Sequence, residues 1–148
     1  MKYDDASWHY EGEFPETSPH EWGGVHMGVF LRLMFMNGMA GEIHLEESPD
    51  AVSDVISGTS TGTKFLFEQM DGKMTDEDFS EAGNVFARAY YGNEEGPFGQ
   101  FLIDLQEVGN FDTYAAPEES VNMAAMEDIF EFRLANFLAT GDVMKEPN

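Results

Sequence analysis

The sequence predicts an all-α fold, a compact single domain of five or six helices around a buried central helix. The first observation is the longest apolar segment of the chain, residues 22–40. It contains continuous apolar runs at 29–31 and 33–36 instead of strict alternation, and its length favours a helix over a strand. The second observation is a series of amphipathic segments that begin at Ser or Thr and end at Gly, as capped helices do.

The central segment is apolar almost all round, which is typical of a helix that is buried on every side. We expect its first turn at Pro19, with Ser18 as the N-cap, and its end near Asn37, with Gly38 at the C-cap. A membrane span is disfavoured because Arg32 would lie near the bilayer centre and the flanks are acidic.

Residues 1–19 show no helical period, so we expect an extended N-terminal arm whose aromatic side chains pack on the domain. This arm and residues 41–45 are the two candidates for a short strand. Residues 141–148 are expected to form a tail after the last helix, and no linker divides the domain at 1–148.

Five further helices are expected from their caps and spacing. They begin at Ser48 and Pro49, at Thr61 or Thr63, at Thr75, near Phe101 and at Ser120, and the last one ends at Gly141. The helix that starts at Thr75 carries Asp78 three residues later, an acidic variant of the capping box, and runs to about Gly92. In the helix near Phe101, Asp104 and Glu107 are expected to face outward.

The charge excludes several classes of function. The 148 residues include 29 acidic and 7 basic ones, which gives a net charge of −22. Nucleic-acid phosphates and anionic membrane surfaces would be repelled, so we expect neither as a partner. What remains is solubility, cation binding or a basic protein partner. The N-terminal residues lack the apolar stretch of a secretory signal, and no Cys is present, so we expect a cytoplasmic protein.

Several short stretches carry a resemblance. The chain opens with MKYDDASWH, and the segment from Gly83 to Tyr91 reads GNVFARAYY. Between them lie His26, Gly28 and Phe30 at alternate positions, a turn with Asn37, Gly38, Gly41, Glu42 and His44, and DGKMTDED at 71–78. Through these stretches, residues 1–110 resemble an uncharacterised bacterial family, a domain of unknown function. The resemblance implies no established activity, but it associates the chain with small acidic proteins found beside secreted bacterial toxins.

The histidines raise the question of a metal site, because imidazole and carboxylate groups bind transition metals. The available groups are His9, His20, His26 and His44, with Asp4, Asp5 and Glu42. No His pair has the spacing of a helical metal motif. His26, on an apolar helix, is expected to be buried and hydrogen-bonded instead of a ligand. We therefore expect no metal and no cofactor, with His9, Glu42 and His44 as the alternative ligand set.

A polar face of the fourth helix is interpreted as structural. Glu81, Asn84 and Arg88 lie at helical spacing, and Asp4 or Asp5 is a candidate acceptor for Arg88. No nucleophile elbow, phosphate-binding loop or dinucleotide fingerprint accompanies them. A catalytic role for this face is therefore the weaker alternative.

The acidic surface favours a binding protein instead of an enzyme: a cytoplasmic inhibitor of immunity type that occludes a basic toxin or nuclease. The expected contacts are Asp76, Glu77, Asp78, Glu94 and Glu95, with Tyr91 and Phe98 as aromatic anchors. Two alternatives stay open. One is a small metal-dependent enzyme that uses the His and carboxylate ligands, and the other is a housekeeping helical protein whose charge provides only solubility.

Overall fold

The computed structural model describes residues 1–92 and 99–144. These residues are mostly helical, with one short sheet, and they form eight α-helices instead of the five or six expected. In chain order the elements are β1 (Lys2–Asp5), α1 (Ala6–Tyr10), the 3₁₀-helix η1 (His20–Gly24), α2 (Val25–Met36), α3 (Glu42–Glu47), α4 (Pro49–Ser57), α5 (Gly62–Gln69), β2 (Lys73–Thr75), η2 (Asp76–Asp78), α6 (Glu81–Tyr90), α7 (Gln100–Glu107), η3 (Glu118–Ser120) and α8 (Met123–Thr140).

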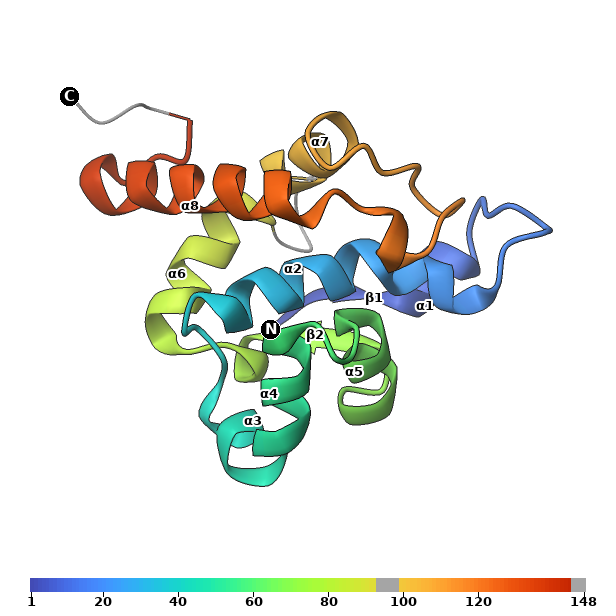
Figure 1. Ribbon diagram of the computed structural model, residues 1–148, viewed down its shortest axis with the longest axis horizontal. Helices are drawn as coiled ribbons and strands as arrows, with labels where there is room; N and C mark the ends of the chain where they lie inside the picture. Colours follow the sequence, from blue (N-terminus) through green and yellow to red (C-terminus); the bar gives the residue numbers. More distant parts are fainter. Residues whose placement is uncertain (93–98, 145–148) are drawn as a thin grey trace.

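Helix α2 runs through the middle of the molecule, with α8 on one side and α3, α4 and α5 on the other (Figure 1). Every residue of α2 except Arg32 and Met36 is buried. Phe30 lies near its middle and packs against five aromatic rings from other parts of the chain, those of Phe79, Tyr90, Tyr91, Phe101 and Phe130. Rings from later helices thus converge on α2, which explains why its sequence is apolar on all sides.

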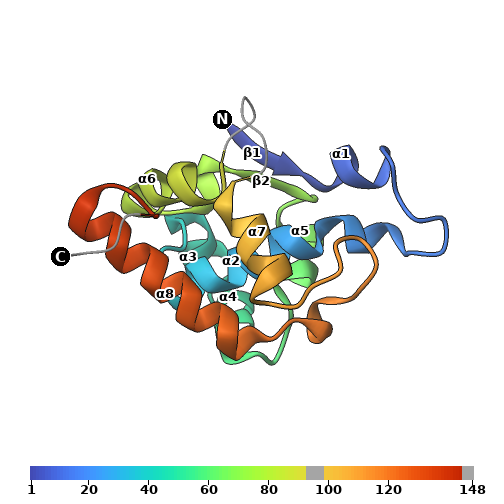
Figure 2. The ribbon, with the colours of Figure 1, turned by 90° about the horizontal axis from the view of Figure 1, so that it is seen from above.

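The N-terminus forms a strand, so the fold is not strictly all-α. Strand β1 pairs antiparallel with β2, with Lys2 opposite Thr75 and Asp5 opposite Lys73. Seen from above, this sheet and α8 lie on opposite sides of α2 (Figure 2). The predicted N-terminal strand is therefore confirmed. Within the arm that was expected to be extended, however, residues 6–10 form helix α1, and the other candidate segment, 41–45, lies largely in helix α3. The partner strand β2 follows Gly72 and was not predicted.

Most of the predicted helices are present, but several begin later than their caps indicated. Helix α4 begins at Pro49 and ends before Gly58, whose φ of +82° is left-handed, as expected. The central helix begins at Val25, after the short 3₁₀ turn η1, and Ser18 does not cap it. The last helix is capped by Asn122 instead of Ser120.

The predicted capping box at Thr75 is confirmed, although its helix is only one turn long. The Thr75 side chain accepts from the backbone of Glu77, and the Asp78 carboxylate accepts from the backbone N–H of Thr75. Phe79 then adopts extended backbone and forms a bridge with Ala40. Helix α6 starts afresh with Ser80 as its N-cap. Pairing with a distant segment thus divides the predicted helix in two.

Helices α2 and α5 touch through two glycines. A Cβ atom built on Gly28 would lie 2.3 Å from the backbone nitrogen of Thr63, and one on Gly62 would lie 1.9 Å from the carbonyl oxygen of Gly28. These distances are too short for any side chain. The glycines therefore set how closely the two helices approach each other.

A buried carboxylate accepts hydrogen bonds from the N-terminal end of α5. Glu118, in η3, accepts hydrogen bonds from the backbone N–H groups of Gly62 and Thr63, at 2.9 and 2.8 Å, and from the Thr63 hydroxyl at 2.7 Å. Free N–H groups and the helix dipole favour a negative charge at this end of a helix. Burial nevertheless raises the pKa of Glu118 above its ordinary value, because desolvation outweighs these bonds.

This raised pKa predicts a pH dependence of stability. The folded chain holds the Glu118 proton more tightly than the unfolded chain does, so the contribution of Glu118 is fully present below the unfolded pKa and falls as pH rises through the folded pKa. We expect the free energy of unfolding of wild type, relative to Glu118→Gln, to decrease as the pH rises above 4.5, the ordinary pKa of this carboxyl group. A tenfold change in proton affinity corresponds to about 1.4 kcal/mol.

Urea denaturation of wild type and Glu118→Gln at several pH values measures the difference between their free energies of unfolding. Glu119→Gln, which changes an exposed neighbouring residue, serves as the control. A difference between wild type and Glu118→Gln that does not vary with pH would contradict the expectation.

Within residues 1–92 and 99–144, no helix combines the length and the apolar character that crossing a membrane requires.

Candidate functional site

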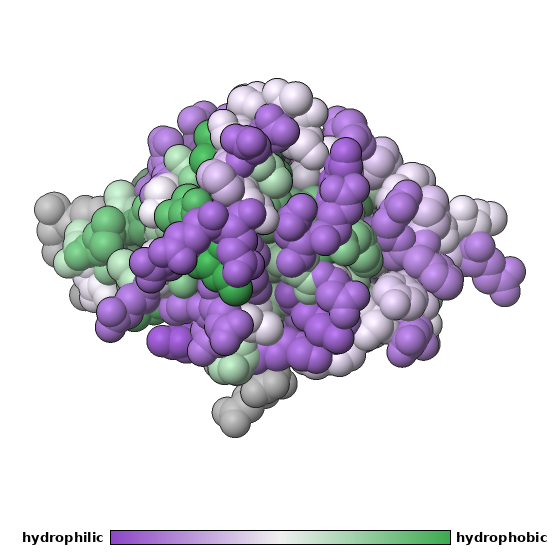
Figure 3. Space-filling view, turned by 90° about the horizontal axis from the view of Figure 1, so that it is seen from below, coloured by the Kyte–Doolittle hydropathy of each residue, from purple (hydrophilic) through white to green (hydrophobic). Residues whose placement is uncertain are grey.

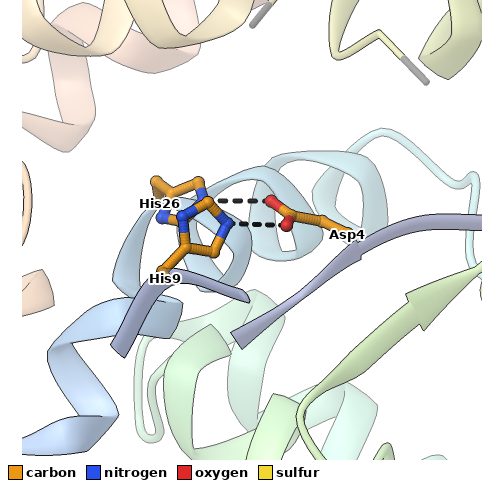
Figure 4. Close-up of side chains that lie close together, drawn as sticks. All are labelled: Asp4, His9 and His26. Carbon is orange, nitrogen blue, oxygen red and sulfur yellow. Dashed lines mark hydrogen bonds and ion pairs between the residues drawn. The ribbon is translucent and has the colours of Figure 1, made fainter. Parts of the chain in front are cut away.

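Three titratable side chains converge beneath the N-terminal segment: Asp4 from β1, His9 from α1 and His26 from α2 (Figure 4). All three are buried, with exposed fractions of 5%, 8% and 2%. Strand β1 pairs with β2, and the chain turns into α1 at Asp5, whose side chain caps this helix by accepting from the Ser7 N–H at 3.0 Å. These local features place Asp4 and His9 over the first turns of α2.

Asp4 is the acceptor at the centre of this cluster. Its carboxylate oxygens lie 2.6 Å from Nε2 of His9 and 3.0 Å from Nε2 of His26. The backbone N–H of Asp5 donates to it at 2.8 Å, and the Tyr91 hydroxyl donates as well. The carboxylate thus has four donors in a buried site, which is the usual way for a protein to hold a charge away from water.

The electrostatics agree with this arrangement. Burial alone raises the pKa of Asp4, but hydrogen bonds and charge from His26 and His9 outweigh it, so the pKa lies well below its usual range. Burial lowers the pKa of His26, with Asp4 acting in the opposite direction. At neutral pH, Asp4 is therefore ionised and His26 is neutral, and the ring N–H of His26 at Nε2 donates to the carboxylate.

Two tyrosines complete the cluster. The Tyr114 hydroxyl is hydrogen-bonded to Nδ1 of His9, and burial raises the pKa of Tyr114 to about 12. Burial and the neighbouring charge of Asp4 also raise the pKa of Tyr91 well above its ordinary value. Both phenols therefore stay protonated at neutral pH. Within the described part of the chain, Nδ1 of His26 is buried and has no hydrogen-bond partner.

This donor set has two chemical uses. A carboxylate between two imidazoles can serve as a fully hydrogen-bonded structural unit that fixes the N-terminal segment. Two imidazole nitrogens and a carboxylate oxygen are also a ligand set for divalent transition metals. The three ligand atoms lie within 4.8 Å of one another, and Asp4, His9 and His26 are the only such group among the residues described.

The alternative ligand set predicted from sequence is not assembled. His44 pairs with Asp78, at 2.6 Å between Nε2 and Oδ1, and both side chains are buried. Glu42 is exposed at the start of α3, and His9 belongs to the Asp4 cluster. The expectation that His26 is buried and hydrogen-bonded is confirmed, although its partner Asp4 was not foreseen.

The predicted polar network of the fourth helix differs in its partners. Asn84 accepts from the Tyr3 hydroxyl at 2.6 Å and donates to the backbone oxygen of Asp76 at 2.8 Å. Asp5 accepts from Lys2 at 3.0 Å, and Asp4 is occupied by the histidines and Tyr91. The network does tie α6 to β1, but through Tyr3 and Asn84.

The expected partner contacts are only partly at the surface. Asp76 is half-buried and Glu77 is exposed, but Asp78 is buried against His44 and the backbone of Thr75. The hydroxyl of Tyr91 donates to Asp4, and the residue as a whole is half-buried, so only part of its ring faces solvent. The remaining three, Glu94, Glu95 and Phe98, lie outside the described residues.

A groove lies between α3 and the segment that leads into α6, and we name it the α3–α6 groove. Its volume is about 730 Å³, and its wall includes Ile43 and Leu45, which are 43% and 52% exposed. Three exposed carboxylates, those of Glu42, Glu77 and Glu81, line it, and no Lys or Arg does. Figure 3 looks onto the side of the molecule where α3 and α4 lie, and hydrophilic residues cover most of this face with hydrophobic atoms between them.

A second hollow, of about 650 Å³, lies between η1, α5 and residues 117–119. Lys64 lines it together with Glu21, Glu68 and Glu119, so its charge is mixed. The α3–α6 groove is therefore the one whose described lining carries carboxylates without a cation.

The sequence did not predict the Asp4 cluster because its members have no motif spacing: His9 lies 5 positions after Asp4, and His26 lies 17 positions after His9. The available signal was that MKYDDASWH, the His26 segment and GNVFARAYY each contain a polar residue of the cluster. Tyr114 lies beyond all these stretches, and only the fold reveals it.

Residues 2–117 match the family model described as Domain of unknown function (DUF7832). No curated protein matches the chain, and no solved structure does. The matched span contains Asp4, His9, His26, Tyr91 and Tyr114, so the whole cluster lies within it, whereas α8 follows it. The match covers well over half of the sequence, and the chain therefore belongs to this family of unknown function, DUF7832.

Proposed function

We propose that this protein is an acidic binding protein of immunity type, which captures a basic protein partner, such as a toxin or a nuclease, and occludes its cationic face. The observation that carries the proposal is the α3–α6 groove, with exposed apolar side chains bordered by the carboxylates of Glu42, Glu77 and Glu81. An apolar contact surrounded by charges of one sign is suited to a partner of the opposite sign.

The distribution of basic residues supports this proposal. No Lys or Arg occurs between Arg32 and Lys64, and in this interval Glu42, Glu46, Glu47, Asp50 and Asp54 are all exposed. Lys2 and Arg133 are paired with Asp5 and Asp104 elsewhere in the molecule. Two cations do lie close by, since Arg32 approaches Gly58 at the end of α4 and Lys73 lines a pocket with Ile43 and His44 of α3. The exposed carboxylates of α3 and α4 outnumber them, and a net negative potential accelerates association with a cationic protein.

A charge-reversal variant tests the proposal. We expect Glu42→Lys/Glu77→Lys/Glu81→Lys to weaken binding to a basic partner at least about 10-fold in low salt, because attraction at the groove becomes repulsion. The partner to be measured first is the purified product of the neighbouring gene, titrated by calorimetry below about 0.1 M salt and again at higher salt.

The matched control is Glu11→Lys/Glu13→Lys/Glu16→Lys, which makes the same change of net charge on exposed side chains beyond α1. These residues lie at the opposite end of the molecule from α3 and α6 (Figure 1). If the control weakens binding as much as the groove variant does, the groove is not the contact site. Absence of binding at low salt would refute the proposal as a whole.

A further inference from the structure

We propose that Asp4, His9 and His26 form a binding site for one divalent transition-metal ion, with Zn²⁺ as the first ion to test. The three side chains come from β1, α1 and α2, three separate elements that the fold brings together. A site built on rigid elements holds its ligands in place before the ion arrives. This inference does not depend on the acidic groove or on a protein partner.

The donor set selects the class of ion. Two imidazoles and one carboxylate suit borderline ions such as zinc and iron(II), whereas calcium and magnesium prefer oxygen ligands. Three protein ligands also leave a coordination position open for water or another molecule. The exposed carboxylates elsewhere on the chain offer oxygen alone, so the Asp4 cluster differs from the rest of the acidic surface.

The spacing is close to what an ion needs. Ligand atoms around a tetrahedral zinc ion lie about 3.3 Å apart, since each is about 2.0–2.1 Å from the metal. The two bonds from Asp4 to the histidines are 2.6 and 3.0 Å, so they are hydrogen bonds. All three ligand atoms lie within 4.8 Å of one another, so side-chain shifts on the order of 1 Å would convert the hydrogen-bonded cluster into a coordinating one.

The surroundings support the ligands from outside. A metal-bound imidazole carries its proton on the nitrogen that does not face the ion, where a neighbouring acceptor holds it. Tyr114 is already bonded to Nδ1 of His9, and Tyr91 and the Asp5 N–H are already bonded to Asp4. Nδ1 of His26 is the exception, because it has no hydrogen-bond partner within the described residues.

The test is a titration of the full chain, freed of metal with a chelator, by Co²⁺ in the presence of millimolar Mg²⁺. The Mg²⁺ competes for the surface carboxylates, and the visible absorption of Co²⁺ reports its ligands. We expect one equivalent of Co²⁺ to bind, with the bands of a four- or five-coordinate site, and one equivalent of Zn²⁺ to displace it. Wild-type protein that binds no Co²⁺ above the Mg²⁺-competed background overturns the proposal.

Variants assign the site. His26→Asn removes a ligand and is expected to weaken Co²⁺ binding more than about 100-fold. Tyr114→Phe removes the hydrogen-bond partner of the ligand His9 and is expected to weaken Co²⁺ binding about 10–100-fold. The control is His44→Asn, because His44 and Asp78 form a buried pair without a third ligand in the described chain. The Co²⁺ affinity of this variant should equal that of wild type.

If His26→Asn does not fold, Tyr114→Phe decides in its place, since it removes only one hydroxyl from a half-buried side chain. Wild-type Co²⁺ affinity in the folded His26→Asn chain, or in Tyr114→Phe when it stands alone, overturns the assignment. An equal loss of affinity in His44→Asn overturns it too.

Discussion

Gly62→Ala is expected to destabilise the fold by at least about 3 kcal/mol, or to prevent folding, although the change adds a single methyl group. The new Cβ atom would lie 1.9 Å from the carbonyl oxygen of Gly28 in the first turn of α2. This obstacle is backbone within a buried helix, so it cannot move aside as a flexible side chain does. Helices α2 and α5 would have to separate, and the packing of the core around them would be lost.

Gly38→Ala is the informative comparison. Gly38 has a φ of +74° and nothing within 4 Å of the position of a Cβ atom, so its cost is only that of left-handed backbone, about 1–2 kcal/mol. Urea denaturation of both variants and of wild type gives the two free energies of unfolding. If Gly62→Ala were no more destabilising than Gly38→Ala, the result would contradict the close backbone contact between α2 and α5 at Gly62.

The sequence predicted elements that local chemistry determines. Pro49 and Gly58 mark the ends of α4 as expected, because a proline at the first turn and a left-handed glycine at the end act within a few residues. The apolar run in the central segment and the Thr75 capping box were visible for the same reason. Such signals need no knowledge of the rest of the chain.

Features that depend on distant segments could not be predicted in this way. Strand β2 exists because Lys73–Thr75 pairs with the first residues of the chain, and α6 starts late because Phe79 bridges to Ala40. The same pairing carries Asp4 over α2 and so creates the cluster with His9 and His26. A predicted tail at 141–148 likewise overlooked Val143, which is buried against α8 with its backbone oxygen bonded to Asn136.

For Asp104, the helical pattern of α7 led to a wrong prediction of which side of the helix faces solvent. Its spacing in α7 predicted a solvent-facing carboxylate, but it is 3% exposed. It accepts from Nε and a terminal nitrogen of Arg133, at 2.9 and 3.0 Å, and from Gln100 at 2.9 Å and the Tyr90 hydroxyl at 2.5 Å. The hydrogen bonds that Arg133 donates to Asp104 raise the pKa of Arg133, so the guanidinium stays charged. The ion pair joins α7 to α8, and the hydrogen bond from Tyr90 adds α6.

Asp104→Ala is therefore expected to destabilise the protein by about 3–5 kcal/mol, because it leaves the half-buried Arg133 guanidinium and the buried Tyr90 hydroxyl without their acceptor. Glu107→Ala, one turn further along α7 and exposed, removes the same charge and should change stability by less than about 0.5 kcal/mol. Relief of general acidic repulsion is common to both variants, so their difference isolates the buried network. Urea denaturation is the measurement, and equal stabilities of the two variants would contradict the prediction.

The double variant Asp104→Leu/Arg133→Met separates two causes of that loss. If the loss of stability in Asp104→Ala comes from the unpaired charge of Arg133, replacing both partners by apolar side chains of similar volume should restore most of the stability. If the ion pair itself holds α7 against α8, the double variant should be as unstable as Asp104→Ala. We expect the first outcome, because a buried ion pair gains little over well-packed apolar side chains once the cost of desolvating both charges is included.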